Sequence, residues 1–414
     1  MRTAKRRQDS PLANRDYVLF LVGAFVSSLG SWMQAVALSW TALQLGHGSS
    51  FVLGLLGFVS TVPVLIFGVA AGDLADRVDR RRVLLVTQSA ALMLAAVLTA
   101  LQAAGRNTVV TLLLIAAANG VVNSLNGPSW QAFIKELVGP KHLRRAVAIN
   151  SVRFNLTRIV GPAVGGWLLV ASGAAACFGV NTLSFLAVIV ALLLIRTHGT
   201  PVAGSRRRGL AATLEIGRNP QIRAVLLPAI GLTVLALPYG SFLPKMADAV
   251  FQQGAGGLSV LLTATGVGAL MGAFVSGLPI VARFPQRSLA LLQVATGLAL
   301  AGFAWSLNIA AGVACLILFG AALIGYLAIA GATIQLAAVP GTEGRALGLW
   351  MIVNSGLVPI GSLLIGVAAD IPAISIRGAL GAAGVGCLLF GVLAVFGGRR
   401  MMRSDGNERR VIVS

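Results

Sequence analysis

Long apolar runs constrain this chain more than any other feature of its sequence. Of its 414 residues, 57% are hydrophobic and only 11% are charged, a balance that is not typical of soluble globular proteins. Each run reaches the length of about 20 residues that a helix needs to cross a bilayer. We expect twelve spans, at residues 17–43, 50–71, 83–104, 108–130, 145–171, 176–195, 223–246, 257–281, 288–307, 310–336, 346–369 and 377–396. The sequence therefore predicts an all-α membrane protein with twelve transmembrane helices.

The basic residues are distributed unevenly between the two sides that these spans define. The sequence holds 32 Lys and Arg against 12 Asp and Glu, a formal net charge of +20. With the N-terminus placed in the cytoplasm, 27 of the 32 cations fall in cytoplasmic segments, as the positive-inside rule requires. We therefore expect both termini to be cytoplasmic. Topology explains the excess charge, so no nucleic-acid partner is expected.

A cluster of seven charges separates the second and third spans, at residues 72–84. Its pattern, Gly-x-Leu-Ala-Asp-Arg-x-x-Arg-Arg, resembles the loop signature of the major facilitator superfamily of transporters, with Asp79 where that signature usually has Gly. The resemblance implies the major facilitator fold, in which two pseudo-symmetric six-helix bundles form the protein. It also implies a latch in which Asp76 faces the start of span eleven, near residues 344–346. The latch residues would be Gly72, Asp76, Arg77, Arg80 and Arg81; a solvated loop that only sets topology is the alternative.

Polar side chains recur at helical spacing inside several predicted spans. Ser27, Ser31 and Gln34 form a stripe on the first span, and a stripe of three asparagines and a tryptophan follows on the fourth. Polar groups at this depth seldom face lipid, so each stripe either lines a cavity or bonds to a neighbouring helix. The candidate cavity residues outside span five are Gln34, Asn119, Asn123, Asn126, Trp130, Tyr239 and Tyr326.

The fifth span carries two arginines within its apolar sequence. Arg153 and Arg158 lie ~13 Å and ~21 Å beyond Arg144 along a helix that rises 1.5 Å per residue, and Arg158 is too deep to reach the inner surface easily. Both are candidate substrate contacts that suit a neutral or anionic ligand. Bonds from each guanidinium to helix carbonyls or to a neighbouring span are the alternative.

A glycine-rich motif follows these arginines on the same span. Its residues, Gly161-Pro162-x-x-Gly165-Gly166, resemble the Gly-Pro-x-x-Gly-Gly motif of superfamily exporters, with Thr157 in place of the usual leading Gly. Proline removes a helix hydrogen bond and the glycines permit close helix packing. We therefore expect Gly161, Pro162, Gly165 and Gly166 to act in gating.

The sequence between residues 131 and 185 resembles one branch of that superfamily in particular, the efflux branch that includes the enterobactin exporter. The resemblance rests on Gln131-Ala132-Phe133, Glu136-Leu137-Val138, Asn150-Ser151, Phe154-Asn155, Arg158, Gly161-Pro162, Cys177-Phe178 and Asn181 through Ser184-Phe185. Trp130 stands where Arg is expected in such relatives. The resemblance implies a secondary transporter in the inner membrane of a bacterium that exports small amphiphilic molecules, such as a drug, siderophore or natural product, by alternating access coupled to protons. An importer of the same fold is the first alternative, and a non-transporting receptor or scaffold is the second.

The predicted spans divide the chain into five segments. These are a cytoplasmic basic arm (1–16), an N-terminal six-helix bundle (17–195), a central cytoplasmic loop (196–222), a C-terminal six-helix bundle (223–398) and a cytoplasmic tail (399–414). An offset of 200 residues aligns Arg145-Ala146 with Arg345-Ala346, which fits duplicated halves with a site at their interface.

The sequence carries no pattern for catalysis. No phosphate loop, nucleophile triad or paired carboxylates occur, and the three cysteines lack paired spacing. We therefore expect no enzyme activity, no metal and no cofactor, and we expect a monomer whose partners are the lipid bilayer, a small-molecule substrate and protons. Every acidic residue falls in a loop or at a span end, so the carboxylates nearest to a proton-coupling role are Asp16, Glu136, Asp248 and Asp370.

Overall fold

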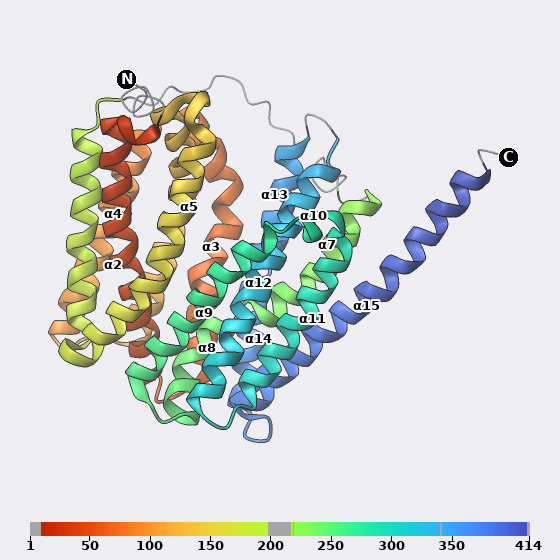
Figure 1. The fold of residues 1–414 in the computed structure, drawn as a ribbon. Coiled ribbons are helices and arrows are strands. Elements are labelled where there is room, and N and C mark those ends of the chain that lie inside the picture. Colours follow the sequence, from red (N-terminus) through yellow and green to blue (C-terminus); the bar gives the residue numbers. More distant parts are fainter. Residues whose placement is uncertain (1–9, 198–216, 218, 340–341, 412–414) are drawn as a thin grey trace. The chain divides into compact units, whose positions relative to one another are not determined.

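The computed structural model describes residues 10–197, 217, 219–339 and 342–411. Within these ranges the chain is helical and contains no strand (Figure 1). The elements are η1 (Pro11–Ala13), α2 (Arg15–Leu45), α3 (Ser50–Arg77), α4 (Arg80–Ala103), α5 (Val109–Leu194), α7 (Pro220–Gly231), η2 (Leu232–Ala236), α8 (Tyr239–Lys245), η3 (Met246–Val250), α9 (Gly254–Ser276), α10 (Pro279–Arg283), α11 (Pro285–Ala304), α12 (Ile309–Ala337), α13 (Glu343–Gly356), α14 (Val358–Asp370) and α15 (Ser375–Val411).

The number of membrane-spanning helices follows from two breaks inside α5. In the described ranges, 10 helical stretches are long and apolar enough to cross a membrane, and α5 is one of them with 86 residues. Gly139 and Gly173 within α5 have φ values of 68° and 78°, a left-handed conformation that glycine adopts at little cost. They divide α5 into three segments, 109–138, 140–172 and 174–194. The two breaks raise ten stretches to twelve, which confirms the predicted fold class.

Several predicted span boundaries differ from the structure, and proline accounts for two of the differences. The eighth span ends with α9 at Ser276 rather than at residue 281, because Leu278 precedes Pro279 and takes an extended conformation. The eleventh span is interrupted at Leu357, between α13 and α14, because Pro359 has no backbone N–H to continue the ladder. The last helix, α15, continues to Val411 rather than ending at residue 396.

One compact unit consists of Met1–Arg207 and Pro244–Thr263. In it α5 packs against α2, α3 and α4, as Figure 1 shows for α2 and α4. Asn14 caps α2, since its Oδ1 accepts hydrogen bonds from the backbone N–H groups of Asp16 and Tyr17. The Tyr17 hydroxyl then donates to the Ala146 carbonyl at 3.0 Å, and Tyr17 belongs to a buried cluster with Phe20 and other side chains of α2, α4 and α5.

A second compact unit consists of Arg208–Leu243 and Ala264–Ser414. Here α11 packs against α12 and α15, and small residues bring the backbones into contact. A Cβ built on Gly268 would lie 2.1 Å from the Ile317 carbonyl oxygen, and one on Gly297 would lie 2.5 Å from the Leu388 nitrogen. Such close approach is typical of helix packing in membranes. Most of the predicted central loop lies outside the described residues, so the predicted domain boundaries stay a prediction.

Large apolar side chains are exposed on both units. Trp167 in the first unit is 69% exposed, and Phe274 in the second is 73% exposed. Water would make such a surface costly, whereas lipid tails cover it without penalty. The chain is therefore built as a multi-pass membrane protein.

Candidate functional site

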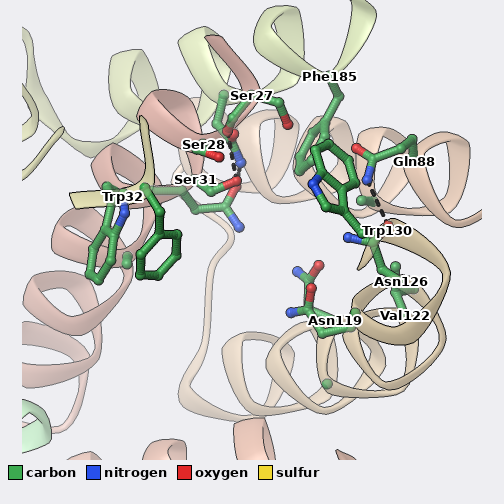
Figure 2. A pocket seen from close by; sticks show the side chains of 18 of the residues that line it. Ser27, Ser28, Ser31, Trp32, Gln88, Asn119, Val122, Asn126, Trp130 and Phe185 are labelled. Carbon is green, nitrogen blue, oxygen red and sulfur yellow. Dashed lines mark hydrogen bonds between the residues drawn. The ribbon is translucent and has the colours of Figure 1, made fainter. Parts of the chain in front are cut away.

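A cavity of about 810 Å³ lies within the first unit, between α2, α3, α4 and α5 (Figure 2). All three segments of α5 contribute to its wall. The polar and charged side chains that line it are Ser27, Ser28, Ser31, Gln34, Ser60, Gln88, Asn119, Asn123, Asn126, Gln131, Asn150, Ser151, Arg153, Asn155 and Asn181. The wall therefore presents hydroxyls, amides and one guanidinium, and none of its residues is a carboxylate.

The stripe on α2 enters this wall and is fixed from behind by the third segment of α5. The Gln34 Oε1 accepts a hydrogen bond of 2.7 Å from the Asn181 Nδ2, and the Asn181 Oδ1 accepts one of 3.0 Å from the Ser184 hydroxyl. Gly30 makes this possible, because a Cβ there would lie 2.7 Å from the Asn181 Oδ1. Ser27 and Ser31 lie on the same face, and the Ser31 hydroxyl donates to the Ser27 carbonyl.

The asparagine stripe lies on the first segment of α5 and lines the same cavity. The Asn126 Oδ1 accepts hydrogen bonds from the Gln88 Nε2 at 3.1 Å and the Thr87 hydroxyl at 3.3 Å; Figure 2 shows the Gln88 amide directed at Asn126. Gln88 is buried, and its Oε1 has no hydrogen-bond partner among the described atoms. Asn119 and Asn123 also line the cavity, with Asn123 exposed. This part of the wall therefore offers free amide groups to a bound molecule.

Arg153 is the single charged residue in the wall and is held by neutral partners. Its guanidinium donates to the Ala24 carbonyl at 2.8 Å and the Ser28 hydroxyl at 2.6 Å. Its Nε donates to the Asn150 Oδ1 at 3.1 Å, and its Cζ lies 5.9 Å from the centre of the Trp130 ring. The side chain is 8% exposed. These bonds stabilise the buried cation without neutralising it, so the cavity keeps a positive charge.

Three other predicted substrate contacts lie away from this cavity. Arg158 follows Arg153 on the same segment and is half-buried, but it does not line the cavity. Tyr239 and Tyr326 belong to the second unit, where both are buried. The Tyr239 ring packs edge-on against Phe319 with 4.3 Å between centroids. The role of these three residues in binding stays a prediction.

The glycines of the predicted gating motif are contact points for neighbouring helices. A Cβ on Gly161 would lie 2.5 Å from the Trp32 Cβ, and one on Gly165 would lie 2.8 Å from the Met33 Cα, both on α2. A Cβ on Gly166 would lie 2.0 Å from the Cβ of Ser259 on α9. The Ser259 hydroxyl donates to the Pro162 carbonyl at 2.8 Å. The motif therefore forms a surface against which α2 and the start of α9 pack closely.

The described part of the predicted latch holds helix ends together. Arg80 forms a buried ion pair with Glu136 on the first segment of α5. The Arg81 guanidinium donates to the Leu192 and Leu193 carbonyls at 2.7 and 3.0 Å, at the end of α5. The remaining latch residues, Gly72, Asp76 and Arg77, lie on α3, but their side chains are outside what the structure describes, so that part of the latch stays a prediction.

Eight polar lining residues were not predicted from the sequence as members of the site: Ser28, Ser60, Gln88, Gln131, Asn150, Ser151, Asn155 and Asn181. Gln88 is an isolated amide in an otherwise apolar run, and this isolation is the signal that could have singled it out. Groups of three or more His, Cys, Asp or Glu that could hold a metal ion do not occur among the described residues.

Comparison with known proteins identifies the class of this protein. The family described as transmembrane secretion effector, a major facilitator family, matches residues 8–409. The staphyloferrin A transporter of Staphylococcus aureus is 26% identical over 363 residues, covering 85% of this chain and 89% of that protein. The multidrug efflux pump Tap of Mycolicibacterium fortuitum is 26% identical over 402 residues, covering 92% and 95%. The enterobactin exporter EntS of Salmonella choleraesuis is 26% identical over 353 residues, covering 83% of each.

Solved structures agree on the fold. The peptide transporter POT superposes with a TM-score of 0.75 at 13% identity, covering 94% of this chain and 95% of that one. The nucleoside transporter NupG superposes with a TM-score of 0.74 at 11% identity, covering 92% and 98%. The family and these relatives are transporters and not enzymes. The chain belongs to the transmembrane secretion effector family and is a major facilitator superfamily transporter of the efflux branch.

Proposed function

We propose that this chain exports small, acceptor-rich molecules, neutral or anionic, across the cytoplasmic membrane of a bacterium, with both termini in the cytoplasm. The wall of the cavity supports this proposal, because it presents amides, hydroxyls and Arg153 and has no carboxylate to attract a cation. Its volume of about 810 Å³ is large enough for a molecule of drug or siderophore size. Relatives named for enterobactin export and multidrug efflux support the same direction, and a relative named for staphyloferrin A transport supports the same size class.

Transport by alternating access requires contacts that can open and close. We propose that the segment 244–263, which packs within the first unit, supplies such contacts. The Ser259 side chain packs against Gly166. The Lys245 ammonium donates to the Gly48 carbonyl in the loop between α2 and α3. The Ser259 hydroxyl donates to the Pro162 and Ala163 carbonyls, and neutral hydrogen bonds of this kind contribute only about 1 kcal/mol each, so this contact can separate at low cost.

We place the proton that drives export outside the cavity. Glu136 is the candidate carboxylate, because its side chain is only 13% exposed and its partner Arg80 is 9% exposed. Protonation of Glu136 would remove its charge attraction for Arg80 and would weaken one of the contacts between the start of α4 and α5. A monomer is the working assembly in this proposal, with the lipid bilayer as its only permanent partner.

The direction of transport can be measured in cells and in membranes. A strain lacking this chain should accumulate staphyloferrin A or enterobactin supplied from within, and everted membrane vesicles carrying the chain should take the same molecule up. Collapse of the pH gradient should stop that uptake. Lower accumulation in the deletion strain would instead indicate an importer. Purified chain that moves neither molecule in liposomes would favour a receptor or scaffold and would refute the proposal.

A further inference from the structure

A second cavity, of about 500 Å³, lies at the start of the second segment of α5. Four of its five lining residues are basic side chains, and none is acidic: it is lined by Lys141, His142, Arg144, Arg145 and Ala148. The positive-inside rule explains why cations occur in this loop. It does not explain why they surround a hollow.

This basic cavity and the larger cavity share one face of the same helix. Arg144, Ala148, Ser151 and Asn155 are spaced i, i+4, i+7 and i+11, which places them in one row. The first two line the basic cavity, and the last two line the larger one. Seven residues separate Arg144 from Ser151, or ~10 Å along the helix axis. A molecule leaving the basic cavity along this row therefore meets the larger cavity within two helical turns.

The number of basic lining residues falls along this row, from the basic cavity to the larger cavity. The basic cavity is lined by cationic side chains, and the larger cavity contains Arg153 as its one charge. Glu136, on the preceding segment, is paired with Arg80. Hollows with one sign of charge and low-dielectric walls concentrate ions of the opposite sign.

We infer that the basic cavity is the entry site through which an anionic solute passes to the larger cavity. The inference rests on the proposed function and narrows its substrate class from neutral or anionic molecules to anionic ones, such as carboxylates. Lys141 and Arg144 act at entry by raising the local concentration of the anion, and Arg153 meets it inside.

Collisional quenching of Trp130 tests this inference without any transport. Five Trp→Phe substitutions, at residues 32, 40, 167, 305 and 350, leave Trp130 as the one fluorophore of a chain that holds six tryptophans. The probes are iodide, an anion, and acrylamide, a neutral quencher, at constant ionic strength in phosphatidylcholine nanodiscs. The ratio of their quenching constants should fall about twofold in the K141Q/R144Q variant, because the variant removes two basic side chains of the basic cavity and solvent screens their effect only in part.

Two controls make the result decisive. R223Q removes one charge from an exposed site on α7 in the second unit and should leave the ratio unchanged, and thermal unfolding should show that all variants fold. An unchanged ratio in K141Q/R144Q would overturn the inference. A ratio that depends on these residues in phosphatidylcholine but not in phosphatidylglycerol would also overturn it, because a lipid headgroup would then occupy the cavity. Because quenching requires no flux, either result leaves the proposed export to be judged by the vesicle assay.

Discussion

The replacement of Arg153 by Met should destabilise the protein by about 2–4 kcal/mol, whereas the same change at Arg158 should cost little. Arg153 makes three hydrogen bonds to neutral groups and is 8% exposed. Hydrogen bonds in membrane proteins average about 0.6 kcal/mol, and a charged donor roughly doubles that value. Three such bonds and the contact with the Trp130 ring sum to about 4–5 kcal/mol. Met avoids the desolvation cost of the buried guanidinium, which offsets part of this loss and leaves the expected range, and it keeps most of the packing volume.

Unfolding in mixed micelles of dodecyl sulfate and a mild detergent measures this difference. Arg158 is the matched control, because it lies on the same segment and forms no hydrogen bond within the described residues. S28A should cost about 1 kcal/mol when Arg153 is present and close to zero in the R153M background, since the bond they share is then already lost. Equal costs for S28A in both backgrounds would refute this explanation of how the arginine is held. R158A should keep the fold and lose efflux of whichever molecule the wild type exports in the vesicle assay, and unchanged efflux would remove Arg158 from the predicted substrate contacts.

Two further predictions concern contacts of the first unit. G166V should displace Ser259 from its contact with residue 166, because a Cβ there would lie 2.0 Å from the Ser259 Cβ. The rate at which a cysteine at residue 259 is labelled should therefore increase. G348A is the control and should leave that rate unchanged, because a Cβ at residue 348 would meet nothing within 4 Å. The R80M variant should cost about 3–5 kcal/mol, because it leaves the Glu136 carboxylate buried without its partner. The R80M/E136L variant should recover part of that loss in the same unfolding assay, and an additive loss would show that the two residues do not interact.

The membrane fold was accessible from sequence because its main determinant is local. The length of an uninterrupted apolar sequence is enough to identify a membrane span. The helical period places Ser27, Ser31 and Gln34 on one face of the first span, and the structure confirms this placement. The breaks inside α5 were accessible in the same way, because Gly139 and Gly173 lie between the predicted spans 108–130, 145–171 and 176–195. The sequence did not indicate which of its 50 glycines would adopt the left-handed conformation.

The two arginines show where sequence reasoning about the site ends. Arg153 and Arg158 have the same chemistry and similar depth, but five residues rotate a helix by ~500°, so they point in directions ~140° apart. Only the position of α2 against α5 decides that Arg153 reaches the Ala24 carbonyl and the cavity wall. Gln88 was missed for a related reason, because its partner Asn126 lies on another helix.

The central claim is that the polar cavity of the first unit binds the molecule that this transporter exports. Efflux from proteoliposomes of a molecule that the wild type transports in the vesicle assay, compared between the wild type and an N119L/N123L variant, tests it most directly. These side chains line the cavity, and the described residues give them no structural hydrogen bond to lose, so the variant should fold. We predict that the wild type transports the molecule and that the variant transports it at least tenfold more slowly. A tenfold loss corresponds to about 1.4 kcal/mol of binding free energy. Efflux at the wild-type rate from the folded variant would contradict the claim.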